Sequence, residues 1–250
     1  MADGFAPCNY FYKPSFLLFF MKLGVLFSGG KDSTYAAYLV KKQGYEIACL
    51  ITIESENKES FMFHTPSILQ TKKQAEAMEI PLIVVRTKGE KEKELIDLEE
   101  GAKRAKKEYK IEGIVTGAVA SVYQSTRIQK ICDKLGLECF NPLWKKDQIE
   151  LLEELIKNKF EVIITGVFAC PLDKKWLGRK IDKKFIEDIK KMNEKYKISI
   201  SGEGGEYESF VLNCPLFKKQ LKVVGFKDFG EKNSWRREIE VEVEGHGIRI

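Results

Sequence analysis

The sequence predicts an α/β protein in which a doubly wound parallel sheet is followed by a smaller α+β domain. Two observations predict this fold. Short apolar runs alternate with helical stretches through the first part of the chain, which is typical of parallel strands joined by crossover helices. Near the C-terminus, apolar and polar residues alternate with a period of two, which indicates antiparallel strands packed on one face. A chain of 250 residues is long enough for either one large domain or two small ones.

The first part of the chain supplies the elements of the parallel sheet in a regular order. Each expected strand is a short apolar run, and each expected helix has an amphipathic pattern. Gly44 is expected to end the first helix because glycine favours the position after a helix. We expect strands at 22–27, 46–53, 81–86 and 113–117, and helices at 33–42, 66–78, 90–107 and 123–135.

The composition changes after Asn141-Pro142, where a second group of elements begins. We expect helices at 147–157 and 181–196, and strands at 161–166, 208–212, 221–226 and 238–244. The predicted organisation is therefore a first domain over 21–142 and a second over 143–250. The groove between two such domains is the default position for a ligand.

Residues 1–20 are expected to be an N-terminal extension outside the functional unit. Their apolar run at 16–21 is shorter than the roughly 20 residues that span a bilayer. Asp3 and the lack of a small-residue cleavage site argue against a signal peptide. The competing interpretation is an arm for interaction with a partner or a membrane surface.

The charge and the cysteine and histidine content exclude several classes of site. The net charge of +5 permits an anionic partner without requiring one. Two histidines argue against a multi-histidine metal site, and none of the six cysteines forms a C-x-x-C pair. Cysteines within apolar runs are expected to be buried reduced thiols, which predicts a cytoplasmic location.

The most informative stretch is S-G-G-K-D-S at the point where the first strand turns into the first helix. Glycines there allow close approach of the backbone to an anion, and the helix N-terminus presents N–H groups to it. An acidic residue beside a phosphate is reasonable if it holds Mg²⁺. The spacing fits neither the Walker A loop nor the dinucleotide pattern. The candidate binding residues are Ser28, Gly29, Gly30, Lys31, Asp32 and Ser33, with Asp32 as the metal ligand.

A second candidate segment follows the fourth predicted strand. Gly117 and Ala118 end that strand at the same sheet edge as the first motif, so they are placed to contact adenine or ribose. Tyr123, Gln124 and Arg127 follow within the next helix, with Tyr123 and Arg127 four apart on one face. A surface pair without function is the alternative for these two residues.

A third candidate segment is an acidic, glycine-bent loop near residue 205. Glu203, Glu206 and Glu208 lie close together in it, either as a solvated turn or as a site for a cationic group, ammonium or a metal. His64 follows the second predicted strand, where a nucleotide base or substrate is expected. A lone histidine at such a position is also commonly structural.

These three segments together resemble a known family. S-G-G-K-D-S resembles the pyrophosphate-binding loop of the N-type ATP pyrophosphatases. With G-A-V-A-S-V-Y-Q-S-T-R from 117 and S-G-E-G-G-E-Y-E-S from 201, the chain resembles the diphthine–ammonia ligase family from 21 to about 217. The resemblance implies a Rossmann-like, adenine nucleotide alpha hydrolase-like fold. It also implies that 28–33 bind the phosphates that leave ATP as pyrophosphate.

The resemblance further implies a reaction and a set of roles. ATP would activate the diphthine carboxylate of translation elongation factor 2 as an acyl-adenylate, and free ammonium would supply the nitrogen. Lys31, Asp32 and Glu206 are then expected to be catalytic, with ATP and Mg²⁺ as cofactors. The expected substrate-binding residues are His64, Tyr123, Gln124, Arg127, Glu203, Glu206 and Glu208.

Two other functions stay open on the sequence. One is a tRNA-modifying enzyme with the same loop, although the thiolating members of that class commonly use C-x-x-C pairs. The other is a nucleotide-sensing module that binds ATP without turnover. We expect no membrane partner, consider nucleic acid an improbable partner, and leave a homo-oligomer open.

Overall fold

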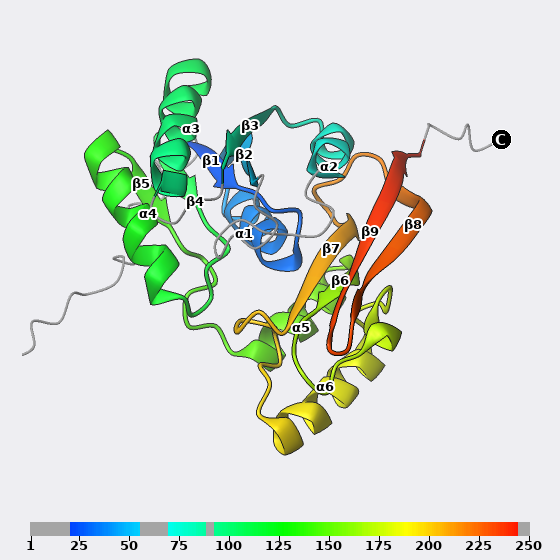
Figure 1. The fold of residues 1–250 in the computed structure, drawn as a ribbon. Coiled ribbons are helices and arrows are strands. Elements are labelled where there is room, and N and C mark those ends of the chain that lie inside the picture. The colour runs from blue at the N-terminus through cyan, green and yellow to red at the C-terminus, as the bar shows by residue number, and fades with distance from the viewer. Residues whose placement is uncertain (1–20, 56–69, 89–92, 245–250) are drawn as a thin grey trace, which may run out of the picture.

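The computed structural model describes residues 21–55, 70–88 and 93–244, and contains two sheets side by side (Figure 1). The expected extension at 1–20 and His64 therefore lie outside the described residues. No helix within the described ranges combines the length and the apolar character needed to cross a membrane.

The first sheet is parallel and has the strand order β3-β2-β1-β4-β5. Its strands are β1 (Lys22–Leu26), β2 (Glu46–Ser55), β3 (Leu82–Thr87), β4 (Gly113–Val115) and β5 (Glu138–Phe140). Its helices are α1 (Lys31–Lys42), α2 (Thr71–Met78), α3 (Lys93–Tyr109) and α4 (Val122–Leu135). Side chains of α1 and α2 pack on one face, and those of α3 and α4 on the other. The predicted doubly wound parallel sheet is confirmed.

The second sheet is antiparallel and has the order β7-β6-β9-β8. Its strands are β6 (Glu161–Val167), β7 (Tyr207–Asn213), β8 (Leu221–Glu231) and β9 (Ser234–Val243). The helical elements of this half are α5 (Gln148–Lys157), the short 3₁₀ helix η3 (Lys174–Trp176) and α6 (Lys183–Tyr196). The antiparallel C-terminal strands are confirmed.

Two features of the strands differ from the prediction. β5 was not predicted, because three residues are too few to show a period and the segment completes the sheet only by pairing with β4. β8 and β9 are also longer than expected and meet at a tight turn, where Lys232 has a φ of 50°. The predicted strands stopped early because polar residues occupy both faces of the hairpin near this turn.

One hydrophobic core continues beneath both sheets. Leu23 and Val25 of the first sheet belong to the same buried cluster as Val162 and Ile164 of the second. α1 connects the two halves because its side chains join this cluster from the first sheet, while α5 and α6 join it from the second. The domain boundary predicted near residue 142 stays a prediction.

The loop between β1 and α1 is hydrogen-bonded directly to the second sheet. The N–H of Val211 in β7 donates to the carbonyl of Gly29 at 3.0 Å. The buried Gln74 of α2 donates its amide to the carbonyls of both Gly29 and Val211, at 2.9 and 2.8 Å. Gly29 has a φ of +78°, and a Cβ there would lie 2.2 Å from Gln74 Oε1, so this position requires glycine. β7 and α2 thus fix the path of the loop.

A polar network fixes the middle of α1 against α5. The hydroxyl of the buried Tyr35 donates to Glu154 Oε2 at 2.5 Å, and Lys146 Nζ lies 3.0 Å from Glu154 Oε1. One turn further along α1, the hydroxyl of Tyr38 donates to Asn158 Oδ1 at 2.9 Å. The first bond joins a neutral donor to a carboxylate, whereas the second joins two neutral groups, so the first should be stronger.

Tyr35→Phe should therefore lower the free energy of unfolding by about 2 kcal/mol, because Glu154 Oε2 loses the hydroxyl that donates to it, while Lys146 still contacts Oε1. Tyr38→Phe on the same helix is the matched control and should cost about 1 kcal/mol. Urea unfolding of both variants provides the measurement. Equal losses for the two would show that the charge of Glu154 adds nothing to the contact.

Candidate functional site

A cavity of about 490 Å³ opens at the carboxyl ends of β1 and β4 and reaches the beginning of β7. The connections run outward in opposite directions from β1 and β4, and sheets of this kind bind ligands at such a switch point. Most of the predicted site residues line this cavity: Ser28, Gly30, Lys31, Asp32, Ser33, Gly117, Ala118, Gln124, Glu203 and Glu208.

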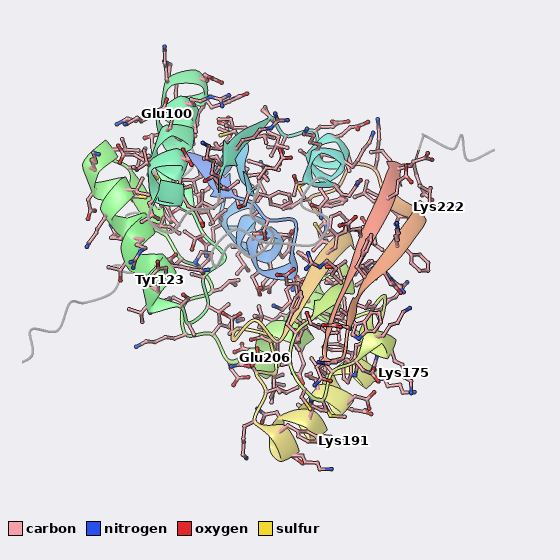
Figure 2. The ribbon with its side chains drawn as sticks, in the orientation of Figure 1. Glu100, Tyr123, Lys175, Lys191, Glu206 and Lys222 are labelled. Atoms are coloured by element: carbon pink, nitrogen blue, oxygen red, sulfur yellow. The ribbon has the colours of Figure 1, made fainter. Side chains whose placement is uncertain are left out.

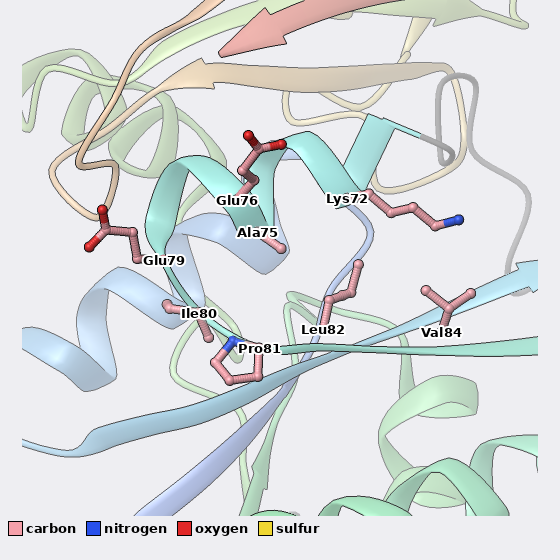
Figure 3. Close-up of a pocket in the computed structure, with 8 residues that line it drawn as sticks. All are labelled: Lys72, Ala75, Glu76, Glu79, Ile80, Pro81, Leu82 and Val84. Carbon is pink, nitrogen blue, oxygen red and sulfur yellow. The ribbon is translucent and has the colours of Figure 1, made fainter. Parts of the chain in front are cut away.

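A second hollow lies between α2 and the edge strand β3 (Figure 3). Its charged side chains, Lys72, Glu76 and Glu79, point away from one another instead of converging. The remaining lining residues are apolar and form an open depression. Converging polar groups distinguish a ligand site, so the cavity at β1 and β4 is the candidate.

The phosphate-type loop is held by its own hydroxyl groups. The N–H of Ser28 donates to Ser33 Oγ at 3.2 Å, and the two hydroxyl oxygens lie 3.1 Å apart. α1 begins immediately after Gly30, which lacks a side chain to cap the helix. The N–H of Lys31 donates to Ser209 Oγ of β7 at 3.1 Å. The first turn of α1 consequently faces the cavity with the positive end of its dipole.

Lys31 and Asp32 form a partly buried ion pair in the first turn of α1. Lys31 Nζ lies 2.7 Å from Asp32 Oδ2 and 5.5 Å from the centre of the Tyr207 ring. Asp32 Oδ1 is buried and has no hydrogen-bond partner. An unsatisfied carboxylate oxygen in a phosphate-type site fits a Mg²⁺ ligand, because Mg²⁺ commonly takes one or two carboxylates together with phosphate oxygens. The described ranges hold no group of three or more side chains placed to bind a metal ion.

The segment after β4 lies directly against the start of α1. A Cβ on Gly117 would be 2.6 Å from the backbone nitrogen of Ser33 and 2.8 Å from the carbonyl carbon of Asp32. The next helix begins at the N-cap Ser121, whose hydroxyl accepts the N–H of Gln124. This close approach brings Gly117, Ala118 and Gln124 to the wall of the cavity.

Tyr123 and Arg127 stack on each other beside the cavity. The guanidinium carbon lies 3.5 Å from the centre of the Tyr123 ring. Neither side chain belongs to the cavity lining. Figure 2 shows Tyr123 on α4, apart from Glu206 on the loop that leads into β7. Their predicted contact with substrate stays a prediction, as does that of His64 outside the described residues.

Glu206 is engaged within its own loop. Its carboxylate accepts the N–H of Ser199 at 2.7 Å and the N–H of Gly204 at 2.9 Å. Gln148 of α5 supports the same loop, because its Oε1 accepts the Ser199 hydroxyl at 2.9 Å. Glu206 does not belong to the cavity lining. This geometry favours a role for Glu206 in shaping the acidic loop over the predicted chemical role, which stays untested.

Glu203 and Glu208 face the cavity and are both shifted toward the neutral form. Burial raises the pKa of Glu203 to about 7; the nearby Asp32 adds to the rise, while Lys31 and the N–H of Ala120 oppose it. Burial likewise raises the pKa of Glu208 to about 8, opposed by the charge of Arg236. Raised carboxyl pKa values in a cavity are typical of functional sites. A cation in this cavity would favour the charged forms of both groups.

The cavity also has lining residues that the sequence did not single out. One end is apolar and is formed by Leu26, Ile51, Ile53 and Ile128. Ser209 and Tyr207 of β7 both contact Lys31. The Ser209 hydroxyl accepts the N–H of Lys31, and the buried Tyr207 ring lies near Lys31 Nζ. In the sequence, these apolar residues have the pattern of ordinary core positions. Only the three-dimensional structure shows that they line the cavity at the end of the sheet.

A phosphate-type loop at a switch point, with a lysine and an aspartate at the start of α1, resembles the pyrophosphate-binding loop of the N-type ATP pyrophosphatases. The diphthamide synthase N-terminal domain model matches residues 21–139, and the C-terminal domain model matches 147–244. The diphthine–ammonia ligases of rat (Rattus norvegicus) and human (Homo sapiens) are both 35% identical, over 81% of this chain and 83% of theirs. The chain therefore belongs to the diphthine–ammonia ligase family.

More distant proteins share parts of this similarity. The diphthine–ammonia ligase of Saccharomyces cerevisiae is 32% identical over 79% of this chain, which corresponds to 34% of the yeast protein. A predicted subunit of tRNA methyltransferase from Methanocaldococcus jannaschii aligns with a TM-score of 0.42 and 19% identity, over 78% of this chain and 98% of that structure. A likeness at that level carries no argument about function.

Gly117→Ala should displace the start of α1, because the added carbon meets backbone atoms that have no freedom to move aside. We expect the affinity for ATP to fall by at least about tenfold, equal to about 1.4 kcal/mol. Titration calorimetry with ATP measures the change. Gly225→Ala is the control, since its added carbon would meet only the Glu240 side chain, at 3.4 Å from Oε2 and 3.8 Å from Cβ. Unchanged ATP affinity in Gly117→Ala would contradict the close approach.

Glu206→Ala should lower stability and activity together, because two backbone N–H groups lose a charged acceptor, at a cost of about 1–3 kcal/mol. Glu203→Gln should lower activity and leave stability nearly unchanged, since the Glu203 carboxyl is already shifted toward the neutral form. Urea unfolding and the rate of AMP formation separate the two effects. A Glu206→Ala protein of full stability without activity would support the chemical role instead.

Proposed function

We propose that this protein amidates diphthine on translation elongation factor 2, using ATP and ammonium and releasing AMP and pyrophosphate. The observation that carries the proposal is one cavity shared by the phosphate-type loop and the acidic loop. Such a cavity can hold the triphosphate of ATP beside a cationic substrate. An acyl-adenylate mechanism suits this arrangement, because adenylation creates the leaving group and ammonia attacks it without an enzyme nucleophile.

The start of α1 performs the phosphate chemistry in this proposal. Lys31 and the N–H groups of the first turn stabilise the negative charge that builds on the departing pyrophosphate. The apolar end of the cavity, formed by Leu26, Ile53 and Ile128, accommodates the adenine ring. In this proposed orientation, the α-phosphate would lie between the loop and β7, within reach of the substrate carboxylate.

Asp32 is the residue that would hold Mg²⁺, through the buried oxygen that lacks a partner. When bound, the ion would neutralise phosphate charge. Lys31 would then turn from Asp32 toward the phosphates. Asp32 would bind the Mg²⁺ ion and Lys31 the phosphates, in place of the ion pair that the two side chains form with each other.

Glu203 and Tyr207 are suited to the trimethylammonium group of diphthine. A quaternary cation has no N–H donor, so it is bound by charge and by aromatic faces. Glu203 supplies the charge, and the ring of Tyr207 already attracts a cation, Lys31 Nζ, at 5.5 Å. A cytoplasmic location follows from the proposed partner, because translation factors work there.

The decisive experiment incubates the protein with ATP, Mg²⁺, isotopically labelled ammonium and elongation factor 2 carrying diphthine. Mass spectrometry of the modified histidine should show the label incorporated as an amide, with one AMP formed for each amide. Without the elongation factor, AMP formation should stay at background. AMP formation with tRNA and an unchanged elongation factor would overturn the proposal in favour of a tRNA-modifying enzyme.

Lys31→Ala should reduce AMP formation by about 10²- to 10³-fold, because a charge that stabilises the departing pyrophosphate is lost. Lys41→Ala, an exposed position on the same helix, is the matched control and should behave as the wild type. Both rates are measured by chromatography of AMP. Retained activity in Lys31→Ala would remove the phosphate role from this residue.

A further inference from the structure

Glu208 is the residue of the acidic loop whose carboxylate lacks a hydrogen-bond partner on one oxygen. It lies at the second position of β7 and lines the cavity. Its Oε2 is buried and has no hydrogen-bond partner, which is a costly state for a carboxyl oxygen. The neighbouring Ser209 accepts the N–H of Lys31, so Glu208 is next in β7 to a residue that contacts the start of α1.

The other two carboxylates of the loop are already engaged. Glu206 accepts two backbone N–H groups, from Ser199 and Gly204. Glu203 accepts the N–H of Ala120 and feels the charges of Lys31 and Asp32. Among these three described glutamates, only Glu208 has a buried carboxylate oxygen without a hydrogen-bond partner.

The missing donor identifies the kind of ligand. A buried carboxylate oxygen is satisfied by a group with an N–H or O–H bond, and a trimethylammonium group has neither. Ammonium carries a positive charge and N–H donors in every direction, and it is small enough to enter the deep side of the cavity. Ammonium is also the second substrate in the proposed function, on which this inference rests.

We infer that Glu208 binds ammonium through its Oε2 and takes a proton from it, so that ammonia is generated beside the acyl-adenylate. An N–H bond of ammonium breaks, its proton goes to Oε2, and the nitrogen keeps the electron pair. That pair forms the C–N bond as the acyl C–O bond to AMP breaks, and the electrons of that bond leave with AMP. The nitrogen loses a second proton to solvent as the amide forms.

The electrostatics of the position agree with this role. Burial raises the pKa of Glu208 to about 8, and Arg236 of β9 opposes the rise. Lys31, Asp32 and Glu203 are the other charged groups that line the cavity. A general base works best when its pKa lies near the working pH, and an ordinary glutamate would be too weak to accept the proton.

Glu208→Gln tests the inference because it keeps the shape of the side chain and removes the base. ATP–pyrophosphate exchange with diphthine-bearing elongation factor 2 should stay at the wild-type rate, since adenylation does not involve ammonium. Amide formation from ammonium should fall by about 10²-fold, with a raised KM for ammonium. Hydroxylamine, which is largely neutral at neutral pH, should restore product formation. Glu242→Gln, exposed on β9, is the matched control.

Three results would overturn the inference: wild-type amide formation from ammonium, equal loss with ammonium and hydroxylamine, or loss of the exchange reaction. If Glu208→Gln does not fold, Glu208→Asp decides, because it keeps the carboxyl but withdraws it. A raised KM for ammonium with unchanged exchange then supports the inference, and an unchanged KM overturns it. Failure of the wild type to form any amide would instead refute the proposed function.

Discussion

The hydrogen bond from Val211 to the carbonyl of Gly29 joins the two halves of the site. This bond joins the edge strand β7 of the antiparallel sheet to the loop that follows β1. Gln74 of α2 strengthens the same contact, because its amide donates to the carbonyls of both Gly29 and Val211. Because β7 is fixed here, Ser209 reaches the first N–H of α1 and Glu208 lies beside it. The phosphate end and the acidic end of the cavity are therefore parts of one hydrogen-bonded unit.

The charged side chains in the cavity interact within the protein in ways that charged ligands can replace. Lys31 and Asp32 neutralise each other, while Glu203 and Glu208 are partly buried carboxyls that are shifted toward their neutral forms. Each of these groups can bind a ligand of opposite charge without leaving an unpaired charge in the protein. The triphosphate and the cations of the substrates would thus replace interactions that the protein makes within itself.

The sequence predicted the parallel sheet, the antiparallel strands and most of the cavity lining, because these depend on local patterns. S-G-G-K-D-S carries its turn, its cation and its acid within six positions. β5 and the full length of the β8–β9 hairpin escaped, since they are defined by pairing with distant strands. The engagement of Glu206 was also hidden, because Ser199 and Gly204 bind it through backbone atoms that no side-chain pattern reveals.

The continuous core beneath both sheets has a consequence for how the molecule responds to damage. Leu23 and Ile164 belong to one buried cluster although they come from different sheets. Loss of either sheet would therefore expose apolar side chains of the other, which couples the stability of the two halves. A substitution under α6 should weaken nucleotide binding some distance away by raising the population of unfolded chains, and any ligand that binds the cavity should protect the whole chain from proteolysis.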